Sequence, residues 1–414
     1  MLTIIAILLV LTAAFAYVNE RFLKWPTTIG AMAIALAFSL LIVGLDLVGI
    51  GGPRRSERAL LASIDFTEVL IGGMLSVLLF AGALQVDLDR LRRLVRPIGV
   101  LAIVGTAVSS LVIGLGCWWL LWLLGIDLPF TYCLLFGALI SPTDPIAVLG
   151  ILSSAKVPAD LEDTITGESL INDGVGVVIF ALLLEMLHSG SAPTLAAAGE
   201  MFLREAAGGV LFGIVVGVAV NRVLASIDNY RVEVLITLAT VIGGYAFCDW
   251  LETSGPLAMV AIGLLVGNEG RALSMSDQTR ERLDIFWHLL DEILNSVLFV
   301  LLGLEVAVIR YQHDSWLAAI SVVVLSLIAR FLAVGLPVLA APGWFGLPTR
   351  AGWLLTWSGV RGGISVALAL SLPPGPHRDT VLMLTYSVVV FSILVQGLSI
   401  GAVARRLGLT ADTA

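Results

Sequence analysis

Charged side chains are scarce in this sequence of 414 residues. Only 13% of the residues are Asp, Glu, Lys or Arg, whereas 58% are hydrophobic and the mean hydropathy is +1.02. An average soluble protein carries about 25% charged residues. A water-facing surface cannot be built from so few charges, which excludes a soluble globular protein and also disordered, collagen-like and coiled-coil chains. Long continuous apolar runs favour a polytopic helical membrane protein over a transmembrane barrel, whose segments are short and alternating.

Lysine and cysteine are rare as well. Lysine occurs only at Lys24 and Lys156, and the net charge is -8, so we expect no nucleic-acid partner. Cys117, Cys133 and Cys248 lie in apolar segments, where we interpret them as small buried side chains rather than disulfide partners or metal ligands. The sequence has no P-loop or other nucleotide motif, no His-based metal motif and no convincing Ser/His pair. We therefore expect neither an enzyme nor a bound cofactor.

Apolar segments long enough to cross a membrane follow one another along the chain. A membrane-spanning helix needs about 20 apolar residues, and by that template the sequence contains about thirteen spans. Their expected limits are residues 2–18, 26–45, 66–86, 97–123, 129–151, 163–187, 203–221, 232–248, 256–267, 286–309, 315–341, 350–372 and 380–404. The first segment also resembles a signal peptide, but it has no basic n-region, so we expect a first transmembrane helix. The sequence thus predicts an all-α polytopic membrane protein.

The distribution of arginine and lysine between loops predicts the orientation. An odd number of spans places the two ends of the chain on opposite sides of the membrane. Loops on the side of the carboxyl terminus hold 15 arginine and lysine residues, and loops on the other side hold 6. The positive-inside rule then predicts a cytoplasmic carboxyl terminus in an inner membrane, although the cluster of Arg54, Arg55 and Arg58 falls on the opposite side.

The fifth expected span, CLLFGALISPTDPIAVLGIL, carries Asp144 between Pro142 and Pro145. Two prolines so close together cannot both lie in a regular helix, because each lacks a backbone donor and clashes with the preceding turn. We expect the helix to be broken there, with free backbone groups beside Asp144. Broken helices of this kind bind ions near the membrane midplane. The alternative is a structural kink with a capping aspartate.

The sixth expected span, TGESLINDGVGVVIFALLLEML, begins with four polar residues that share one region of a helix. Ser169 and Asp173 are four residues apart and lie on one face, and Glu168 and Asn172 lie on the adjoining face. Together with Asp144 they form an all-oxygen cluster, which suits a hard cation such as Na⁺ better than a transition metal. The alternative, a polar helix start at the cytoplasmic interface, accounts poorly for Asp173, which lies about two turns further in.

Two arginines lie inside apolar spans in the second half of the chain, namely Arg330 in SLIARFLAVGLP and Arg361 in TWSGVRGGISVALALSLP. A charge at the bilayer centre costs about 2.5–3.5 kcal/mol on insertion scales, so both need partners. Gly359, Gly362 and Gly363 flank the second arginine and predict another helix break. Breaks in the middle helix of spans 4–6 and of spans 11–13 suggest an inverted repeat. Tight packing alone is the alternative explanation for these glycines.

Other polar residues carry less weight. Glu305 is interpreted as a gate, a ligand for a second ion or an interface residue. The charged stretch 277–292 is interpreted as an amphipathic lead into the tenth span rather than as a site, and the four histidines as solvated residues near span ends.

Four short motifs together resemble a known family. SPTDP at 141–145, GESLINDG at 167–174, IAR at 328–330 and VRGG at 360–363 are similar to motifs of the NhaP-type cation:proton antiporters and of the eukaryotic sodium/proton exchangers. The likeness covers essentially the whole chain. It implies an NhaA-like antiporter fold with inverted repeats and two broken helices that cross.

The resemblance also implies roles for individual residues. Asp173 is implied to be the carboxylate that binds both the cation and the proton. The residues implied to complete or support the cation site are Thr143, Asp144, Glu168 and Ser169, with Thr143 acting through its backbone carbonyl. Asn172 precedes Asp173, and an Asn-Asp pair is typical of electroneutral members.

The two arginines take structural roles by the same resemblance. Arg330 is implied to pair with Glu168, and Arg361 to hold the region of the broken helix. Among the acidic residues inside the membrane, Asp144 is the only partner that we can assign to Arg361.

These expectations lead to one preferred function. We expect a homodimeric secondary antiporter that exchanges Na⁺ (or Li⁺) for H⁺, with residues 97–190 and 313–414 forming a moving core and residues 1–96 and 191–312 forming scaffold and dimerisation helices. A K⁺/H⁺ antiporter remains an alternative, because both cations use the same ligand types. An ion channel is a second alternative, although channels need an axial pore and usually a symmetric filter.

Overall fold

The described part of this chain is built from helices and contains no strand, as expected for segments that must satisfy their own backbone hydrogen bonds in hydrocarbon. The computed structural model describes residues 2–47, 73–144, 146–189, 195–270, 277–305 and 315–410. The helices are α1 (Leu2–Val18), α2 (Thr27–Leu47), α4 (Leu75–Leu84), α5 (Leu88–Arg93), α6 (Val95–Gly99), α7 (Thr106–Leu123), α8 (Phe130–Ile140), α9 (Ile146–Ser154), α10 (Ala159–Ser189), α11 (Leu195–Leu224), α12 (Tyr230–Trp250), α13 (Gly255–Leu265), α15 (Asp277–Glu305), α16 (Ser315–Arg330), α17 (Leu336–Ala340), α18 (Pro342–Phe345), α19 (Ala351–Trp357), α20 (Gly363–Leu370), α21 (Pro376–Phe391) and α22 (Leu398–Arg406). Short π-helical stretches extend or join several of them, namely η1 (Asn19–Leu23), η3 (Val100–Gly105), η4 (Val266–Gly270), η5 (Phe331–Gly335) and η6 (Ser392–Gly397).

The all-helical membrane architecture predicted from the sequence is confirmed. Nine helices of the described residues are long and apolar enough to cross a membrane. Three shorter apolar helices accompany them, namely Leu75–Leu84, Phe130–Ile140 and Gly255–Asn268. Helix occurs in each of the expected segments, while the count of thirteen spans stays a prediction.

Some of the expected features fall outside the described residues. The third expected span, 66–86, is described only from residue 73 onward. The arginine cluster at Arg54, Arg55 and Arg58, and the second proline of the broken fifth span, Pro145, also lie outside the described residues.

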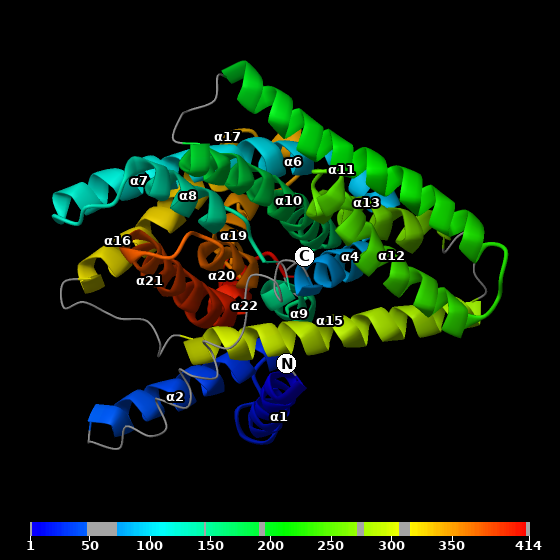
Figure 1. The fold of residues 1–414 in the computed structure, drawn as a ribbon, viewed down its shortest axis with the longest axis horizontal. Helices are drawn as coiled ribbons and strands as arrows, with labels where there is room; N and C mark the ends of the chain where they lie inside the picture. Colours follow the sequence, from blue (N-terminus) through cyan, green and yellow to red (C-terminus); the bar gives the residue numbers. More distant parts are fainter. Residues whose placement is uncertain are drawn as a thin grey trace.

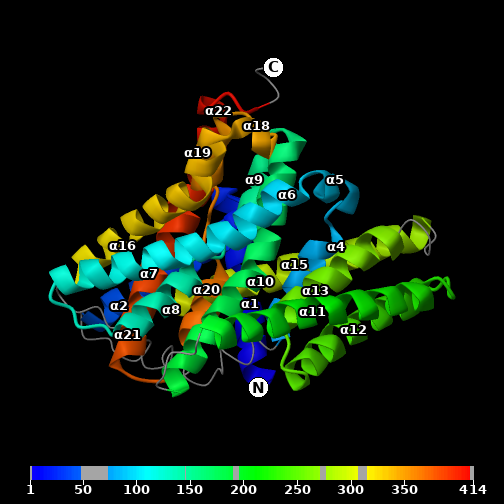
Figure 2. The same cartoon turned by 90° about the horizontal axis from the view of Figure 1, so that it is seen from above.

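The helices form two groups that contact each other through α10 and, to a smaller extent, through α15 and α20 (Figure 1). The core group contains α7, α8, α9 and α10 together with α16 to α22, and within it α7 packs on α8 and α16 while α21 packs on α16 and α20. The flanking group contains α4, α11, α12 and α13, with the long helix α15 running past α1 and α2. In Figure 2 the labelled amino-terminal end and α22 lie at opposite ends of the molecule.

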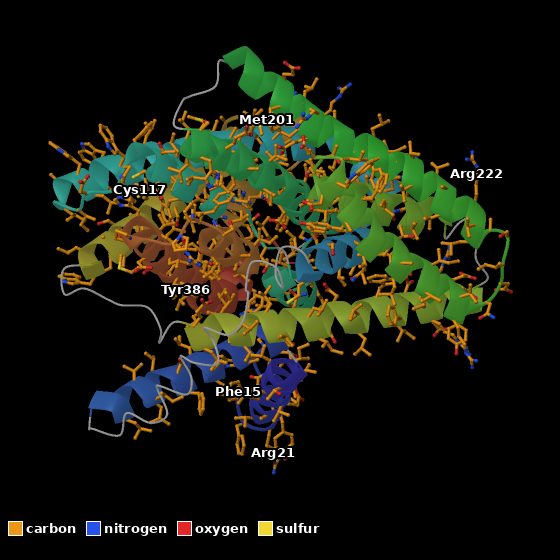
Figure 3. All side chains as sticks on the ribbon, viewed as in Figure 1. Phe15, Arg21, Cys117, Met201, Arg222 and Tyr386 are labelled. Atoms are coloured by element: carbon orange, nitrogen blue, oxygen red, sulfur yellow. The ribbon has the colours of Figure 1, made fainter. Side chains whose placement is uncertain are left out.

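The labelled side chains lie at different depths in the molecule. The arginines Arg21 and Arg222 extend from the periphery, whereas Cys117 and Tyr386 lie inside (Figure 3). All three cysteines are buried and free, which confirms their interpretation as small buried side chains.

The first helix break separates α8 from α9. Helix α8 ends at Ile140, directly before Ser141 and Pro142, and the Ser141 hydroxyl donates to the carbonyl oxygen of Gly137 at 2.7 Å. A proline cannot donate a backbone hydrogen bond and clashes with the turn before it, which explains why the helix stops there. The break that the sequence predicts within span 129–151 is therefore present.

The second break separates α19 from α20 and is held by residues of η6. The side chain of Gln396 donates to the carbonyl oxygen of Trp357 at 3.0 Å, at the end of α19. The Ser392 hydroxyl accepts from the backbone N–H of Arg361 at 2.8 Å. The two unwound segments also touch, because the Asp144 N–H donates to the Val360 carbonyl oxygen at 2.7 Å. The two unwound segments therefore meet, and these contacts satisfy some of the backbone groups that the helix breaks leave free. Buried backbone groups at membrane depth need such partners.

Helices α7 and α8 approach each other closely through glycines. A Cβ atom added at Gly137 would overlap the carbonyl oxygen of Ser110, and one added at Gly114 would lie 2.8 Å from a methyl carbon of Leu134. Such small residues let membrane helices pack backbone against backbone, where a hydrophobic driving force is absent.

We predict that Gly137→Ala lowers the melting temperature of the protein in detergent. The added methyl group would overlap backbone atoms that cannot move aside, and overpacking of this kind costs about 1–3 kcal/mol. Gly243→Ala in α12 is the matched control, since no neighbouring atom lies within 4 Å of its added Cβ. It should leave the melting temperature unchanged or raise it. Equal melting temperatures for the two variants would contradict the close contact.

Candidate ion-binding site

A buried ion pair joins α10 to α16. The guanidinium of Arg330 donates to both carboxylate oxygens of Glu168, at 2.7 Å to Oε1 and 2.6 Å to Oε2. Glu168 is fully buried and Arg330 is 4% exposed. The Arg330 Nε also donates to the Leu355 carbonyl oxygen at 3.3 Å, which connects α19 to the pair. This two-pronged geometry is the strongest form of arginine–carboxylate contact, and it fixes three helices to one another.

The amide of Asn172 connects this ion pair to the first unwound segment. Its Nδ2 donates to Glu168 Oε1 at 2.7 Å and to Thr143 Oγ1 at 2.8 Å. Its Oδ1 accepts from the backbone N–H of Thr143 at 3.1 Å. The hydroxyls of Thr143 and Ser169 share a further hydrogen bond of 2.9 Å. With Arg330 included, five of the residues singled out from the sequence therefore form one continuous network.

Asp173 differs from these neighbours because its carboxylate is left open. It is only 5% exposed, yet it forms no hydrogen bond or ion pair with any described residue. Asp144 and Glu168 are its like-charged neighbours, and Arg361 is the opposite charge near it. Buried polar groups normally have partners, so an open buried carboxylate requires an explanation.

Arg361 lies close to the same group of carboxylates. Its Nη1 donates to the Gly359 carbonyl oxygen at 3.0 Å, and the charges of Glu168 and Asp173 act on it. Arg361 thereby contributes its positive charge to the region around Asp173, while its pairing with Asp144 stays a prediction.

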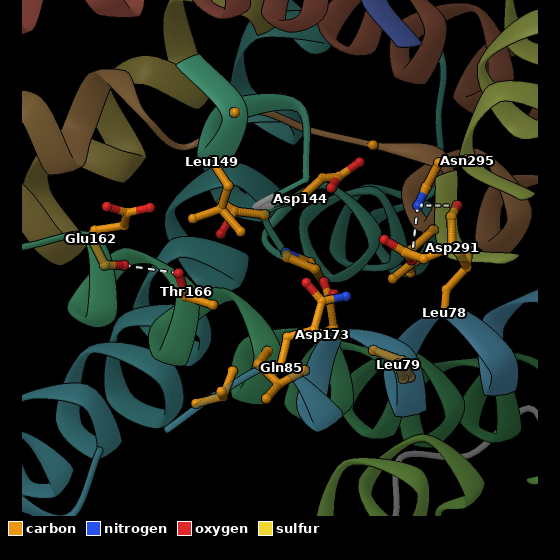
Figure 4. Close-up of a pocket in the computed structure, with 18 of the residues that line it drawn as sticks. Leu78, Leu79, Gln85, Asp144, Leu149, Glu162, Thr166, Asp173, Asp291 and Asn295 are labelled. Atoms are coloured by element: carbon orange, nitrogen blue, oxygen red, sulfur yellow. Dashed lines mark hydrogen bonds between the residues drawn. The ribbon is translucent and has the colours of Figure 1, made fainter. Parts of the chain in front are cut away.

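A cavity of about 720 Å³ reaches the open carboxylate of Asp173 (Figure 4). Thr143 and Asp144 line it, whereas Glu168, Ser169 and Asn172 do not. The acidic residues of its lining are Asp87, Asp144, Glu162, Asp163, Asp173, Asp291 and Glu292, and the basic or imidazole residues are Arg90 and His288. Asp87 and Arg90 are at least half exposed, so the cavity opens at their end. A cavity lined mainly by one sign of charge concentrates counter-ions of the other sign.

Two of the flanking glycines are required by close approach. A Cβ atom added at Gly362 would overlap the Asp144 carboxylate, and one at Gly359 would lie 2.7 Å from Arg330 Nε. These glycines therefore allow charged side chains to pack directly against unwound backbone. Both explanations given from the sequence, a helix break and tight packing, apply to them.

The structure also reveals polar residues that sequence reasoning missed. Ser392 and Gln396 hold the second unwound segment, and Asp291 and Asn295 line the cavity. In each pair the two polar residues are four positions apart in an apolar helix, as Glu168 and Asn172 are. This spacing, which places both side chains on one helix face, could have identified them from the sequence. Glu305, in contrast, accepts a hydrogen bond from Tyr386 and does not line the cavity.

We predict that Glu168→Ala and Arg330→Ala each destabilise the protein strongly. Removing one partner of a buried ion pair leaves an uncompensated charge and costs about 3–5 kcal/mol. Swapping the two residues should recover part of the loss, and melting in detergent measures both effects. The control is Arg204→Ala, which removes a pair of similar length, 2.9 Å to Glu252, that is exposed to solvent. If both buried variants melt like this control, the ion pair is not a structural requirement.

Comparison with known proteins places the whole chain in one family. The family model described as "Sodium/hydrogen exchanger, transmembrane" matches residues 7–406. The Na(+)/H(+) antiporter NhaP of Pseudomonas aeruginosa is 50% identical over 411 residues, which cover 98% of this chain and 97% of that protein. The Na(+)/H(+) antiporter NhaH of Halobacillus dabanensis is 34% identical over 412 residues, covering 98% of each. The solved structure of the sodium proton antiporter MjNhaP1 from Methanocaldococcus jannaschii has the same fold, with a TM-score of 0.77 at 20% identity over 98% of this chain and 99% of that one. The chain belongs to the transmembrane sodium/hydrogen exchanger family.

Proposed function

We propose that this protein is a secondary antiporter that exchanges Na⁺ (or Li⁺) for H⁺ across an inner membrane, with Asp173 binding either ion in turn. The observation that carries the proposal is the open, buried carboxylate of Asp173 at the deep end of an acidic cavity. The names of the similar proteins from P. aeruginosa and H. dabanensis support the same exchange. A carboxylate holds either a proton or a metal cation at its oxygens, so the two ions compete.

The charges inside the core group explain why exchange is obligatory. Arg330 and Arg361 provide two positive charges, and Asp144, Glu168 and Asp173 provide three negative ones. The fully ionised set therefore carries one net negative charge, which a proton or a monovalent cation cancels. An unneutralised charge at the membrane centre costs about 2.5–3.5 kcal/mol on insertion scales. Only the loaded forms then pass between the two open states.

The cation would be held by hard oxygen ligands, which suit Na⁺ and Li⁺. Asp173, Asp144 and Thr143 line the cavity, and the proposed inner ligands are the two carboxylates and the backbone carbonyl of Thr143. Ser169 and Asn172 support them by holding Thr143 in place. Among the described residues no group of three or more His, Cys, Asp or Glu side chains is placed to hold a metal ion, so hydroxyl, backbone or water oxygens must complete the shell.

Alternating access would follow from movement of the core group against the flanking group. The proposed division assigns residues 97–190 and 313–414 to the moving core, and residues 1–96 and 191–312 to the scaffold of a homodimer. The exposed lining residues Asp87 and Arg90 lie at the start of α5 and within it, respectively. Figure 2 shows α5 toward the same end of the molecule as α22. The loop charges predict that this end is cytoplasmic, so we assign the structure to an inward-open state.

Purified protein in proteoliposomes tests the proposal directly. An outward-directed Na⁺ gradient should drive protons inward, measured with a pH-sensitive dye trapped in the lumen. Parallel gradients of Li⁺, K⁺ and choline distinguish the cation. Proton movement driven by K⁺ but not by Na⁺ would replace the proposed substrate, and currents far above a transporter's rate would favour a channel.

We predict that Asp173→Asn abolishes exchange and leaves a folded protein. Asparagine keeps the size of the side chain but binds no proton, so the shared site is lost. Glu281→Gln, an exposed carboxylate on α15 away from the cavity, is the matched control and should retain exchange. If Asp173→Asn exchanges ions at the rate of the parent protein, Asp173 is not the carboxylate that binds the cation and the proton.

We also predict that exchange is electroneutral, with one cation moved for each proton. Asp173 alone changes its load, and Asn172 beside it adds no second titratable group. The measurement is the exchange rate at fixed ion gradients under an imposed membrane potential. Each net charge moved contributes about 2.3 kcal/mol per 100 mV, so a rate or endpoint that follows the potential contradicts the prediction.

A further inference from the structure

The wall of the cavity that α15 forms carries a second pair of buried polar residues. Asp291 and Asn295 lie one turn apart on this helix, and they are 9% and 1% exposed. The Asn295 Nδ2 donates to the backbone oxygen of Asp291 at 2.9 Å and to its Oδ1 at 3.0 Å. Figure 4 shows this pair beside the same space that Asp144 and Asp173 border.

This hydrogen bonding fixes which atoms remain open. Because Nδ2 of Asn295 is engaged by two oxygen acceptors, the amide cannot be turned over without placing oxygen against oxygen. Its Oδ1, and the Oδ2 of Asp291, accept no hydrogen bond from any described residue.

A third open oxygen comes from a different helix. Ser365 of α20 lines the same cavity, is 1% exposed, and its hydroxyl has no hydrogen-bond partner among the described residues. Buried acceptors without donors indicate a place that an ion or water occupies.

We propose that Asp291, Asn295 and Ser365 form a second binding position for a monovalent cation, through which Na⁺ passes on its way to Asp173. The inference rests on the proposed Na⁺/H⁺ exchange. The open groups are oxygens, which hard cations prefer. Asp291 and Asp144 also repel each other electrostatically, so a cation near both carboxylates is favoured over a neutral water molecule.

The place of Asp291 in the fold defines its role. Helix α15 packs against α2 and against α4 and α12 of the flanking group, and its contact with the core group is mainly with α20. Asp291 is therefore on the side of the cavity that stays with the scaffold, while Asp173 belongs to the core. A cation at the second position is loaded from the cavity and does not travel with the core, so it leaves the coupling of one cation to one proton unchanged.

Cation binding in detergent tests the second position without transport. The melting temperature is measured as NaCl replaces choline chloride at constant ionic strength and alkaline pH. A ligand that binds the folded state raises this temperature. In Asp173→Asn, which lacks the inner carboxylate, a part of the Na⁺-dependent rise should persist, and Asp173→Asn combined with Asp291→Asn should abolish it. Loss of the entire rise in Asp173→Asn alone overturns the second position.

Transport kinetics separate a binding role from a structural one. In otherwise unchanged protein, Asp291→Asn should raise the KM for Na⁺ by about tenfold, equivalent to about 1.4 kcal/mol, with the maximal rate retained. Asn295→Ala provides a second variant if Asp291→Asn does not fold, and it should shift KM in the same direction. Glu281→Gln on the same helix is the matched control and should leave KM unchanged. A KM equal to that of the parent in both cavity variants overturns the inference.

The two proposals fail in different ways in these experiments. A parent protein that does not exchange Na⁺ for H⁺ overturns the proposed function, while the melting measurements still decide whether the second position binds Na⁺. Normal exchange by the parent, combined with no residual Na⁺ effect in Asp173→Asn, leaves the proposed function intact and removes only the second position.

Discussion

The bidentate contact between Arg330 and Glu168 is the interaction on which the rest of the site depends. It neutralises a carboxylate that would otherwise be costly to bury, and it orients that carboxylate to accept from Asn172. Asn172 in turn holds both the backbone N–H and the hydroxyl of Thr143, so the first unwound segment is positioned by the ion pair. The contact of Arg330 with the Leu355 carbonyl extends the same control to the helix that leads into the second break.

Helix breaks at membrane depth divide the buried polar residues into two kinds. Residues of the first kind satisfy backbone groups that the breaks expose, as Ser392 and Gln396 do for the second break. Residues of the second kind, Asp173 above all, keep open oxygens toward the cavity. Residues of the first kind are held rigidly because their hydrogen bonds are complete. Residues of the second kind have free oxygen lone pairs, which can bind ions. The division follows from hydrogen-bond partners and not from residue type.

Much of this site is predictable from residue spacing, because local chemistry decides it. A proline in a helix interior kinks or breaks the helix, as Pro142 does, and residues four apart on one helix, such as Glu168 and Asn172, lie on the same face. Contacts between distant segments are not encoded in this way. The charged stretch 277–292 is interpreted from the sequence as an amphipathic lead into a span rather than as a site, yet its residue Asp291 is buried and lines the cavity. Periodicity identifies a polar face, but tertiary packing decides whether that face meets lipid, water or a second helix group.

The proposed movement of the core group past the flanking group would place different electrostatic requirements on their charges. In that mechanism the charges of the core group sum to zero in the loaded state, because uncompensated charge is expensive inside the membrane. Charges of the flanking group would face no such limit, since that group is proposed to stay in place beside the cavity. This difference permits an acidic cavity with Asp291, Glu292 and Asp87 in its lining next to a core whose buried charges need one monovalent ion to become neutral. On this proposal the fixed carboxylates concentrate cations near the site without entering the exchange ratio, so separate residues attract the substrate and couple it to the proton.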